Sequence, residues 1–387
     1  INTDAILDAI EKSGADAVHP GYGFFSENAD FAQAITERGV TFVGPPPAAI
    51  EVMGDKISAR EAAEKVDVHG VPGSTAILTD PAEVIAFGDE YGWPVAIKAA
   101  YGGGGRGMKV VQNADEAADQ LASAQREALA YFGRDECYMA RYLTKPRHVE
   151  VQVVADQHGN VVHLWERDCS VQRRHQKLIE ESPSPNVDQQ TREAICAAAV
   201  RMIKAADYTN VGTVEFIVDQ EGNFYFIEVN ARVQVEHPVT EMVTGVDIIK
   251  AQLRIAAGEV LPFCQEDITP EGASIECRIN AENPDRNFQP CPGKIESMFI
   301  PGGLGVRFVS HTHAGYTVSP FYDSMVGKLI VHQPTRREAI ECMLRALGEL
   351  QIQGIATTCS RHEEILRHAA FVESRIDTTF VERTWDQ

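Results

Sequence analysis

The sequence lacks the patterns of a membrane protein and of a disulfide-stabilised secreted domain. No apolar run reaches the roughly 18 residues that a membrane-spanning helix needs, so no membrane association is expected. None of the cysteines falls in a CxxC pair, and reduced, mostly buried thiols are therefore expected. The eight cysteines are scattered along the chain, at Cys137, Cys169, Cys196, Cys264, Cys277, Cys291, Cys342 and Cys359.

Positive charge is also scarce, because 35 Lys and Arg face 56 Asp and Glu, a formal net charge of −21. Binding to a nucleic-acid backbone depends on neutralising phosphates with Lys and Arg, so no nucleic-acid partner is expected. A local basic pocket remains compatible with this total.

Length and composition are those of a multidomain globular enzyme. The 387 residues, 44% of them hydrophobic, predict two or three domains. The first residues, which do not begin with methionine, already follow a helical pattern, so we expect part of the N-terminal domain to be missing. No hydrophobic leader opens the sequence, and the expected location is the cytoplasm, or an organelle matrix after processing.

The N-terminal third alternates between strand and helix patterns. A strand over 15–18, a loop over 19–24, a helix to Ile35 and a strand over 40–43 predict a βαβ unit and a parallel sheet. The next block, about residues 71–143, has a helix that starts at Asp80 with Glu83 as its capping partner. We expect this block to form a small hinged lid.

A glycine-rich loop, YGGGGRGM at Tyr101–Met108, follows the predicted strand 95–99. Successive glycines let backbone N–H groups approach a phosphate closely, and Lys98 and Arg106 supply positive charge. The loop is not a Walker loop, because no GK[ST] follows it. Simple flexibility is the alternative interpretation of such a run.

The stretch Gly212–Pro238, GTVEFIVDQEGNFYFIEVNARVQVEHP, predicts a hairpin with an acidic face. Closure about Glu221-Gly222 would place Glu215 directly across from Glu228, and Asn230 on the same face. Oxygen ligands of this kind suit Mg²⁺ or Mn²⁺. The alternative is a hairpin edge whose glutamates merely face water.

A strand is also predicted over 147–154, with His148 and Glu150 on one face. After it comes RDCSVQRRHQKLIEESP, Arg167–Pro183, a segment dense in cations. In so acidic a chain we expect it to face a phosphate or a carboxylate, although a solvated basic loop is the alternative.

Taken together, these motifs resemble biotin carboxylase, the ATP-grasp component of biotin-dependent carboxylases. The resemblance extends over essentially the whole chain and is highly specific at Glu228–Pro238, EVNARVQVEHP. It implies an α/β and α+β fold of three parts: a partial Rossmann-like N-terminal domain (1–54), an ATP-grasp domain with its lid (55–256), and a C-terminal biotin carboxylase domain (257–387). Related ATP-grasp enzymes share the lid and the metal carboxylates, but not RRHQK together with VQVEHP.

The resemblance implies a reaction and its cofactors. ATP and bicarbonate give carboxyphosphate, which breaks down to CO₂ and phosphate, and biotin on a carrier protein captures the CO₂. The implied cofactors are ATP, two Mg²⁺ or Mn²⁺ ions and carrier-bound biotin. The implied partners are a biotin carboxyl carrier protein or domain and a carboxyltransferase subunit, with assembly as a homodimer left open.

The resemblance also assigns roles to individual residues. Glu236 matches the base that deprotonates bicarbonate, Arg278 the arginine that steadies the biotin enolate, and Tyr22 the loop beside biotin. Bicarbonate would be held by Lys177, Arg232, Gln234 and Val235, and the metal ions by Glu215, Glu228 and Asn230. The nucleotide would be bound by Lys56, Lys98, Gly103, Gly104, Gly105, Gly107, Met108, Arg141, Leu143, His148, Gln172, His175 and Ile217.

Some positions depart from the family pattern and keep alternatives open. Ala140 stands where an acidic residue usually precedes the adenine hinge, and Val309 replaces an acidic residue near Arg307, a homodimer-interface position. The alternatives are another ATP-grasp carboxylate ligase working through an acyl phosphate, or a catalytically impaired ATP-binding homologue. As structural pairings, Arg232 could bridge to Glu236, and Arg278 to Glu282.

Overall fold

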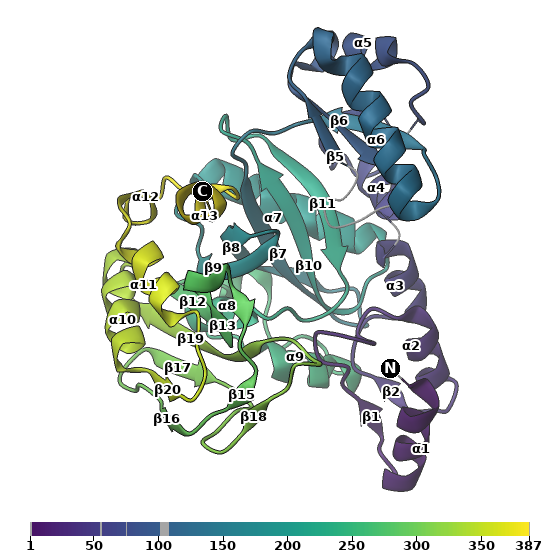
Figure 1. Cartoon of the computed structure of the whole chain (residues 1–387). Coiled ribbons are helices and arrows are strands. Elements are labelled where there is room, and N and C mark those ends of the chain that lie inside the picture. The colour runs from purple at the N-terminus through teal and green to yellow at the C-terminus, as the bar shows by residue number, and fades with distance from the viewer. Residues whose placement is uncertain (1, 55, 75, 101–107, 387) are drawn as a thin grey trace.

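The computed structural model describes residues 2–54, 56–74, 76–100 and 108–386, without the side chains of Lys56, Ile57 and Phe132. Its centre is an eight-stranded antiparallel sheet in the order β11-β10-β7-β8-β9-β12-β19-β17. The strands span β7 Arg147–Ala155, β8 Val161–Arg173, β9 Gln176–Ser182, β10 Asn210–Val218, β11 Phe224–Asn230, β12 Ala273–Asn280, β17 Val306–Val309 and β19 Met325–Gln333. Figure 1 shows the smaller units arranged around this sheet.

The N-terminal unit is the predicted βαβ element. Strand β1 (Ala17–Val18) pairs in parallel with β2 (Thr41–Phe42), and helix α2 (Ala29–Thr36) connects them. Asn28 caps α2 by accepting a hydrogen bond from the backbone N–H of Phe31 (2.7 Å). Helices α1 (Thr3–Ser13), α3 (Pro47–Gly54) and α4 (Lys56–Glu64) complete this end of the chain.

The block after α4 forms a separate four-stranded sheet with its own apolar core. Its strands are β3 (Gly73–Ser74), β4 (Val95–Ala99), β5 (Met108–Val111) and β6 (Cys137–Arg141), in the order β3-β6-β4-β5. Helices α5 (Pro81–Tyr91) and α6 (Ala117–Phe132) cover it, and α5 carries the predicted Asp80–Glu83 capping box. This block projects away from the central sheet at the top of Figure 1, and we call it the lid.

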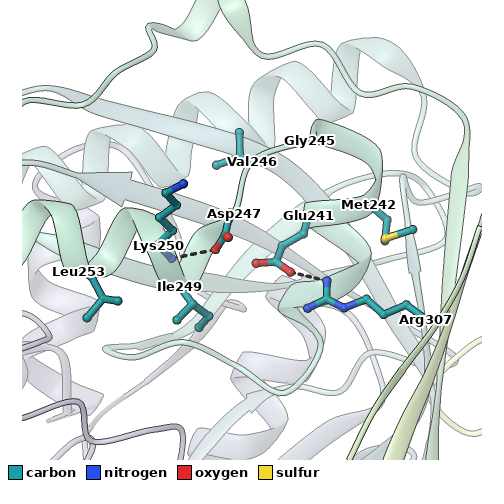
Figure 2. Close-up of a pocket in the computed structure, with 9 residues that line it drawn as sticks. All are labelled: Glu241, Met242, Gly245, Val246, Asp247, Ile249, Lys250, Leu253 and Arg307. Carbon is teal, nitrogen blue, oxygen red and sulfur yellow. Dashed lines mark hydrogen bonds and ion pairs between the residues drawn. The ribbon is translucent and has the colours of Figure 1, made fainter.

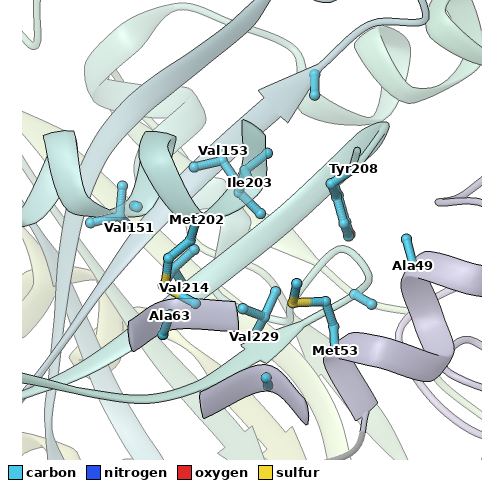
Figure 3. Packing of buried hydrophobic residues seen from close by; sticks show 14 of the residues in the cluster. Ala49, Met53, Ala63, Val151, Val153, Met202, Ile203, Tyr208, Val214 and Val229 are labelled. Atoms are coloured by element: carbon cyan, nitrogen blue, oxygen red, sulfur yellow. The ribbon is translucent and has the colours of Figure 1, made fainter. Parts of the chain in front are cut away.

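One face of the central sheet is apolar and packs on helices. Val149, Val151 and Val153 alternate along β7 and lie in one cluster with residues of α7 (Gln189–Ala205), α3 and α4. Figure 3 shows Val151 and Val153 beside Met202 and Ile203 of α7, with Met53 of α3 close by. The intervening side chains of β7 therefore point to the opposite face.

The C-terminal region extends the same sheet instead of forming a separate one. Strand β12 pairs with β9 through Ser274↔Ser182 to Cys277↔Ile179, and β19 then pairs with β12. Helices α8 (His237–Thr244) and α9 (Ile248–Ala256) connect β11 to this region. Helices α10 (Arg336–Glu349), α11 (Cys359–Arg367), α12 (Ala369–Val372) and α13 (Phe380–Trp385) follow β19.

The remaining short strands form small two-stranded sheets at the C-terminal end. They are β13 (Glu282–Asn283) with β14 (Gln289–Pro290), β15 (Gly293–Lys294) with β18 (Thr317–Val318), and β16 (Ser297–Phe299) with β20 (Gln351–Gln353). Within the described ranges, no helix combines the length and apolar character needed to cross a membrane. All eight cysteines are free, but only four of them, Cys137, Cys169, Cys196 and Cys277, are buried, fewer than expected.

The basic segment after β7 differs from the solvated-loop alternative. Residues 167–173 continue β8 and 176–182 form β9, so this segment lies within the sheet. Arg167 and Arg173 are buried because partners elsewhere in the chain bind them, whereas Arg174 and His175 in the β8–β9 turn are exposed.

Candidate active site

The candidate active site lies on the polar face of the central sheet. His148, Glu150 and Gln152 alternate with the buried valines of β7, and all three are buried. Neighbouring strands bring Lys177 from β9, Glu215 from β10 and Arg278 from β12 to the same region. The period-two pattern of the sequence thus separates an apolar core from a charged site.

Lys177 is the centre of this charge cluster. Its ammonium group donates to Glu150 Oε2 (2.5 Å), Glu236 Oε1 (2.6 Å) and Glu215 Oε1 (3.1 Å). Burial alone would lower the pKa of Lys177, but the surrounding carboxylates outweigh it and raise the pKa well above its ordinary value. Lys177 is therefore a permanent cation.

Glu215 and Glu228 are directly paired across β10 and β11, as the hairpin pattern predicts. The closure is not symmetric, because a bulge shifts the register between Glu215 and Phe216, so that Phe216 pairs with Phe226. Asn230 belongs to the same site, since its Nδ2 donates to Glu215 Oε1 (2.8 Å). The hairpin is not a solvated edge, because Glu215 and Asn230 are buried.

Glu215 is held in its charged form by protein cations. Its Oε2 lies 2.9 Å from His148 Nε2, and Lys177 contacts its other oxygen. Burial would raise the pKa of Glu215, but Lys177 and His148 hold it well below its ordinary value. Burial would lower the pKa of His148, and the charge of Glu215 raises it instead. His148 thus contacts a predicted metal ligand.

Glu236 and Arg278, the predicted base and biotin-binding arginine, are in direct contact. Arg278 Nη2 donates to Glu236 Oε2 (2.8 Å), and its Nε donates to Glu180 Oε1 (2.5 Å). Burial would raise the pKa of Glu236, but Lys177 and Arg278 keep it far below its ordinary value. The alternative pairing of Arg278 with Glu282 is wrong, since Glu180 and Glu236 bind this guanidinium.

Arg232 is held by the N-terminal loop and not by Glu236, so that alternative pairing is also wrong. Its Nε donates to Glu27 Oε2 (2.7 Å), and its Nη2 donates to Asn230 Oδ1 (2.8 Å). Gln234 donates through Nε2 to Glu215 Oε1 (2.8 Å). Glu27, in the motif FFSENADFA, is a site residue that sequence reasoning missed.

Arg167 is a second missed residue and is fully buried beneath the site. It donates to Glu150 Oε1 (2.6 Å), Gln152 Oε1 (2.7 Å) and Gln234 Oε1 (2.8 Å), and also to Thr213 and Thr240. Glu150 therefore bridges Arg167 and Lys177. The shared strand face of His148 and Glu150 was the only sequence signal for this arrangement.

The predicted nucleotide-binding residues are divided between the lid and the sheet. Lys98 on β4 pairs with Met108 on β5, and Val95 pairs with Arg141 at the end of β6. Leu143 follows β6 and is half-buried. Ile217 on β10 pairs with His148 on β7. Gly103, Gly104, Gly105, Gly107 and the side chain of Lys56 lie outside the described residues.

Gln172 and His175 flank the turn between β8 and β9. Gln172 is buried and pairs with Lys177 in the ladder, whereas His175 is exposed in the turn with φ of 64°. The structure thus places Gln172 in the sheet beside the charge cluster and His175 at its rim.

Tyr22 and Val235 lie near the Arg278 side of the site. Lys328 on β19 donates to the carbonyl oxygen of Val235, and its Nζ lies 5.9 Å from the centre of the Tyr22 ring. Burial, followed by the charge of Glu276, raises the pKa of Tyr22. Lys328 therefore connects the predicted biotin side to the predicted bicarbonate loop.

A pocket of about 630 Å³ lies away from this cluster, between α8, α9 and β17. Figure 2 shows the ion pair between Arg307 and Glu241 on its wall, where Arg307 Nη1 lies 2.7 Å from Glu241 Oε2. The pocket contains none of the predicted catalytic residues. Volume alone does not identify the reactive site.

Three family models match consecutive parts of the chain. They are "Biotin carboxylase, N-terminal domain" at residues 1–50, "Carbamoyl-phosphate synthase L chain, ATP binding domain" at 55–264, and "Biotin carboxylase C-terminal domain" at 276–383. Biotin carboxylase 1 of Bacillus subtilis is 50% identical over 387 residues, which are 100% of this chain and 86% of that protein. The chloroplastic biotin carboxylase of Arabidopsis thaliana is 50% identical over 97% of this chain and 70% of its own.

Solved structures agree with this assignment. The β,γ-ATP complex of Campylobacter jejuni biotin carboxylase superposes with a TM-score of 0.90 at 45% identity, covering 99% of this chain and 85% of that one. A dimer of the biotin carboxylase domain of Hydrogenobacter thermophilus 2-oxoglutarate carboxylase, with MgADP and bicarbonate, gives 0.89 at 46% identity, covering 99% and 84%. The chain belongs to the biotin carboxylase family of ATP-grasp enzymes.

Proposed function

We propose that the protein carboxylates biotin on a carrier protein, using ATP and bicarbonate through carboxyphosphate. The observation that carries the proposal is the convergence of Glu236, Lys177 and Arg278 beside the paired Glu215 and Glu228. One end of this cluster suits polyphosphate and metal, and the other suits a planar anion next to a base. A different ATP-grasp carboxylate ligase is not favoured, since the similarity to biotin carboxylases extends over the full length of the chain.

Glu236 is proposed to accept the bicarbonate proton. Its two cation contacts keep it ionised, but they also make it a weak base, because a depressed pKa reduces the driving force for proton transfer. Bicarbonate and the ATP phosphates would compete for Lys177 and Arg278, and thereby raise the pKa of Glu236 when the substrates are bound. Glu236 would then be a strong enough base only when bicarbonate and ATP are bound.

Arg232, Gln234, Val235 and Lys177 are proposed to hold bicarbonate, and Arg278 with Tyr22 to receive biotin. Arg232 is anchored by Glu27, which orients its guanidinium without the other site carboxylates. A planar fork of N–H donors suits a planar carbonate. ATP is proposed to be bound by the glycine loop together with residues of the lid and the sheet: Lys56, Lys98, Met108, Arg141, Leu143, His148, Gln172, His175 and Ile217.

The donor set of Glu215, Glu228 and Asn230 fits Mg²⁺ or Mn²⁺, because these ions prefer carboxylate and amide oxygens. We propose that these residues hold two such ions. When bound, the ions would neutralise charge on the transferred phosphoryl group. In the structure, Lys177 and His148 supply the positive charge at Glu215.

The proposal includes partners and domain organisation. Biotin would arrive on a carrier protein or domain, a carboxyltransferase subunit would use the carboxylated product, and the subunit would form a homodimer. The three proposed parts are residues 1–54, 55–256 and 257–387. The last two share one sheet through the pairing of β9 with β12.

The test is bicarbonate-dependent ADP release stimulated by free biotin. Glu236→Gln is expected to lower turnover by about 10² to 10⁴, the usual contribution of a positioned base, and to retain ATP binding by calorimetry. Arg278→Ala is expected to lose the biotin stimulation. Glu259→Gln and Arg254→Ala are matched controls, because they break an exposed ion pair of the same chemistry. Equal turnover in all five proteins, wild type included, would reject the assignment.

A further inference from the structure

Arg278 is surrounded by more carboxyl groups than it contacts. Glu180 and Glu236 accept its hydrogen bonds, and Glu276 lies two residues before it on the same face of β12. Glu180 and Glu276 are both fully buried. Glu276 has two buried oxygens with no hydrogen-bond partner, and Glu180 Oε2 is a third. A buried unpartnered carboxylate is costly, so this corner needs an explanation.

The sheet register brings the unpartnered oxygens together. Glu276 on β12 pairs directly with Glu180 on β9, which places their Cβ atoms about 4.5–5.5 Å apart. Two ionised carboxylates at that spacing repel each other, whereas one proton between them gives a hydrogen bond. Such a bond would use Glu180 Oε2 and one oxygen of Glu276.

The main chain of Arg278 is fixed independently of its side chain. Its carbonyl oxygen accepts from Thr358 Oγ1 (3.0 Å) and lies 2.7 Å from His362 Nε2. Burial lowers the pKa of His362 to about 4, so the neutral ring donates through Nε2. The position of the guanidinium is therefore determined by the carboxylates that it contacts.

We propose that Glu276 is a positioning residue for Arg278, a protonated acid that donates a hydrogen bond to Glu180 and so holds the Glu180 carboxylate against the guanidinium. An ionised Glu276 would compete with Glu180 and Glu236 for the same arginine. A neutral one leaves Arg278 aimed at Glu236. The inference rests on the proposed function only for its effect on biotin.

The surroundings of Glu276 favour this state. Burial, together with the charges of Glu180 and Glu236, raises the pKa of Glu276 to about 8 against the opposing effects of Lys328 and Arg278, whereas burial raises the pKa of Glu180 only to about 7 because Arg278 contacts it directly. The opposite face of β12 is apolar, since Ile275, Cys277 and Ile279 lie in the C-terminal core with α10. The titratable or charged groups facing Glu276 are Glu180 from β9, Lys328 from β19, Arg278 from its own strand, Glu236 from the loop before α8 and Tyr22 from the N-terminal loop.

The first test measures the protonation state of Glu276 and does not depend on enzymatic activity. Infrared difference spectroscopy at pH 7 between the wild type and Glu276→Gln is expected to show the carbonyl stretch of a buried carboxylic acid in the wild type alone. That band should disappear as pH rises through about 8. A wild type without the band, or equal bands in both proteins, would overturn the proposal whether or not the protein is active.

The second test reads the effect on biotin. The wild-type KM for biotin is expected to rise as pH passes about 8, and Glu276→Gln, which stays neutral, should lose that dependence while matching the wild type at pH 7. Glu276→Ala should raise the KM for biotin by up to about 10²-fold, because a misplacement of about 1 Å in a contact group can cost that much. Ser274→Ala is the control: it removes a buried hydrogen bond on the same strand face and away from Arg278.

The outcomes separate the two proposals. A wild type without biotin-stimulated ADP release contradicts the proposed function, while the infrared band still decides the protonation of Glu276. An active wild type whose biotin KM has the same pH dependence as that of Glu276→Gln overturns the positioning role. If Glu276→Ala does not fold, the Glu276→Gln profile decides alone.

Discussion

The lid and the central sheet are built on different kinds of interior. The lid has a small apolar core formed by residues such as Leu78, Val95 and Leu121. The central sheet has an apolar face as well, but its other face buries Arg167 and Glu150 and holds Lys177 largely out of solvent. The groups proposed for the chemistry therefore lie on the large sheet, whereas the lid carries residues that are proposed to bind the nucleotide and has an apolar core of its own.

The largest expected difference between the two regions is the cost of removing a buried cation. Arg167→Met should lower the free energy of unfolding by about 3–5 kcal/mol, because it leaves Glu150 and two glutamines without their shared donor. Urea denaturation measures this value.

The matched lid variant is Lys109→Met, which breaks a partly exposed ion pair with Glu127. This variant should lower the free energy of unfolding by less than about 1 kcal/mol. Equal costs for the two variants would contradict the comparison, because buried and half-exposed charges would then contribute alike.

The next prediction tests whether the lid is an independent packing unit. A Cβ at Gly88 on α5 would lie 2.4 Å from the Trp93 ring, so Gly88→Ala should cost about 1–3 kcal/mol by overpacking. Hydrogen exchange should speed up in α5 and α6 and stay unchanged in β7 and β10. The control is Gly348→Ala on α10, where the added methyl group would have no neighbour within 4 Å outside the adjoining residues and backbone of its own helix. Faster exchange in the central sheet would show that the two cores are coupled.

The smallest effect is expected on the outer surface. Arg337→Ala on α10 removes an exposed pair with Glu341, one helical turn away. The expected change is about 0.3–0.5 kcal/mol, and it should shrink in high salt. If Arg337→Ala lowered the free energy of unfolding by more than Gly88→Ala does, surface charge would stabilise this fold more than packing does.

The sequence predicts the parts of the fold that follow local rules. The capping box of α5, the alternation along β7 and the pairing of Glu215 with Glu228 all depend on residues close together in the chain. The bulge after Glu215 and the length of β8 do not follow from residues close together in the chain. Burying Arg167 depends on Gln234 and Thr240, which lie 67 and 73 residues away, and short-range patterns contain no such information.

The candidate site divides in the same way. The motifs identify Lys177, Glu236 and Arg278, which the structure brings together, but they do not identify Glu27 or Arg167. Glu27 contacts Arg232 across 205 residues of sequence. A carboxylate in a loop has many potential partners, and only tertiary structure selects one.

The pairing of β9 with β12 has a mechanical consequence. Lys177 and Arg278 belong to neighbouring strands of one hydrogen-bonded ladder, so the interval between the groups proposed to bind bicarbonate and biotin is set by backbone geometry. Opening the lid for nucleotide exchange would leave that interval unchanged. Carrier proteins of different shape could therefore deliver biotin to Arg278 at the same distance from Lys177, because the sheet sets that distance and the carrier does not.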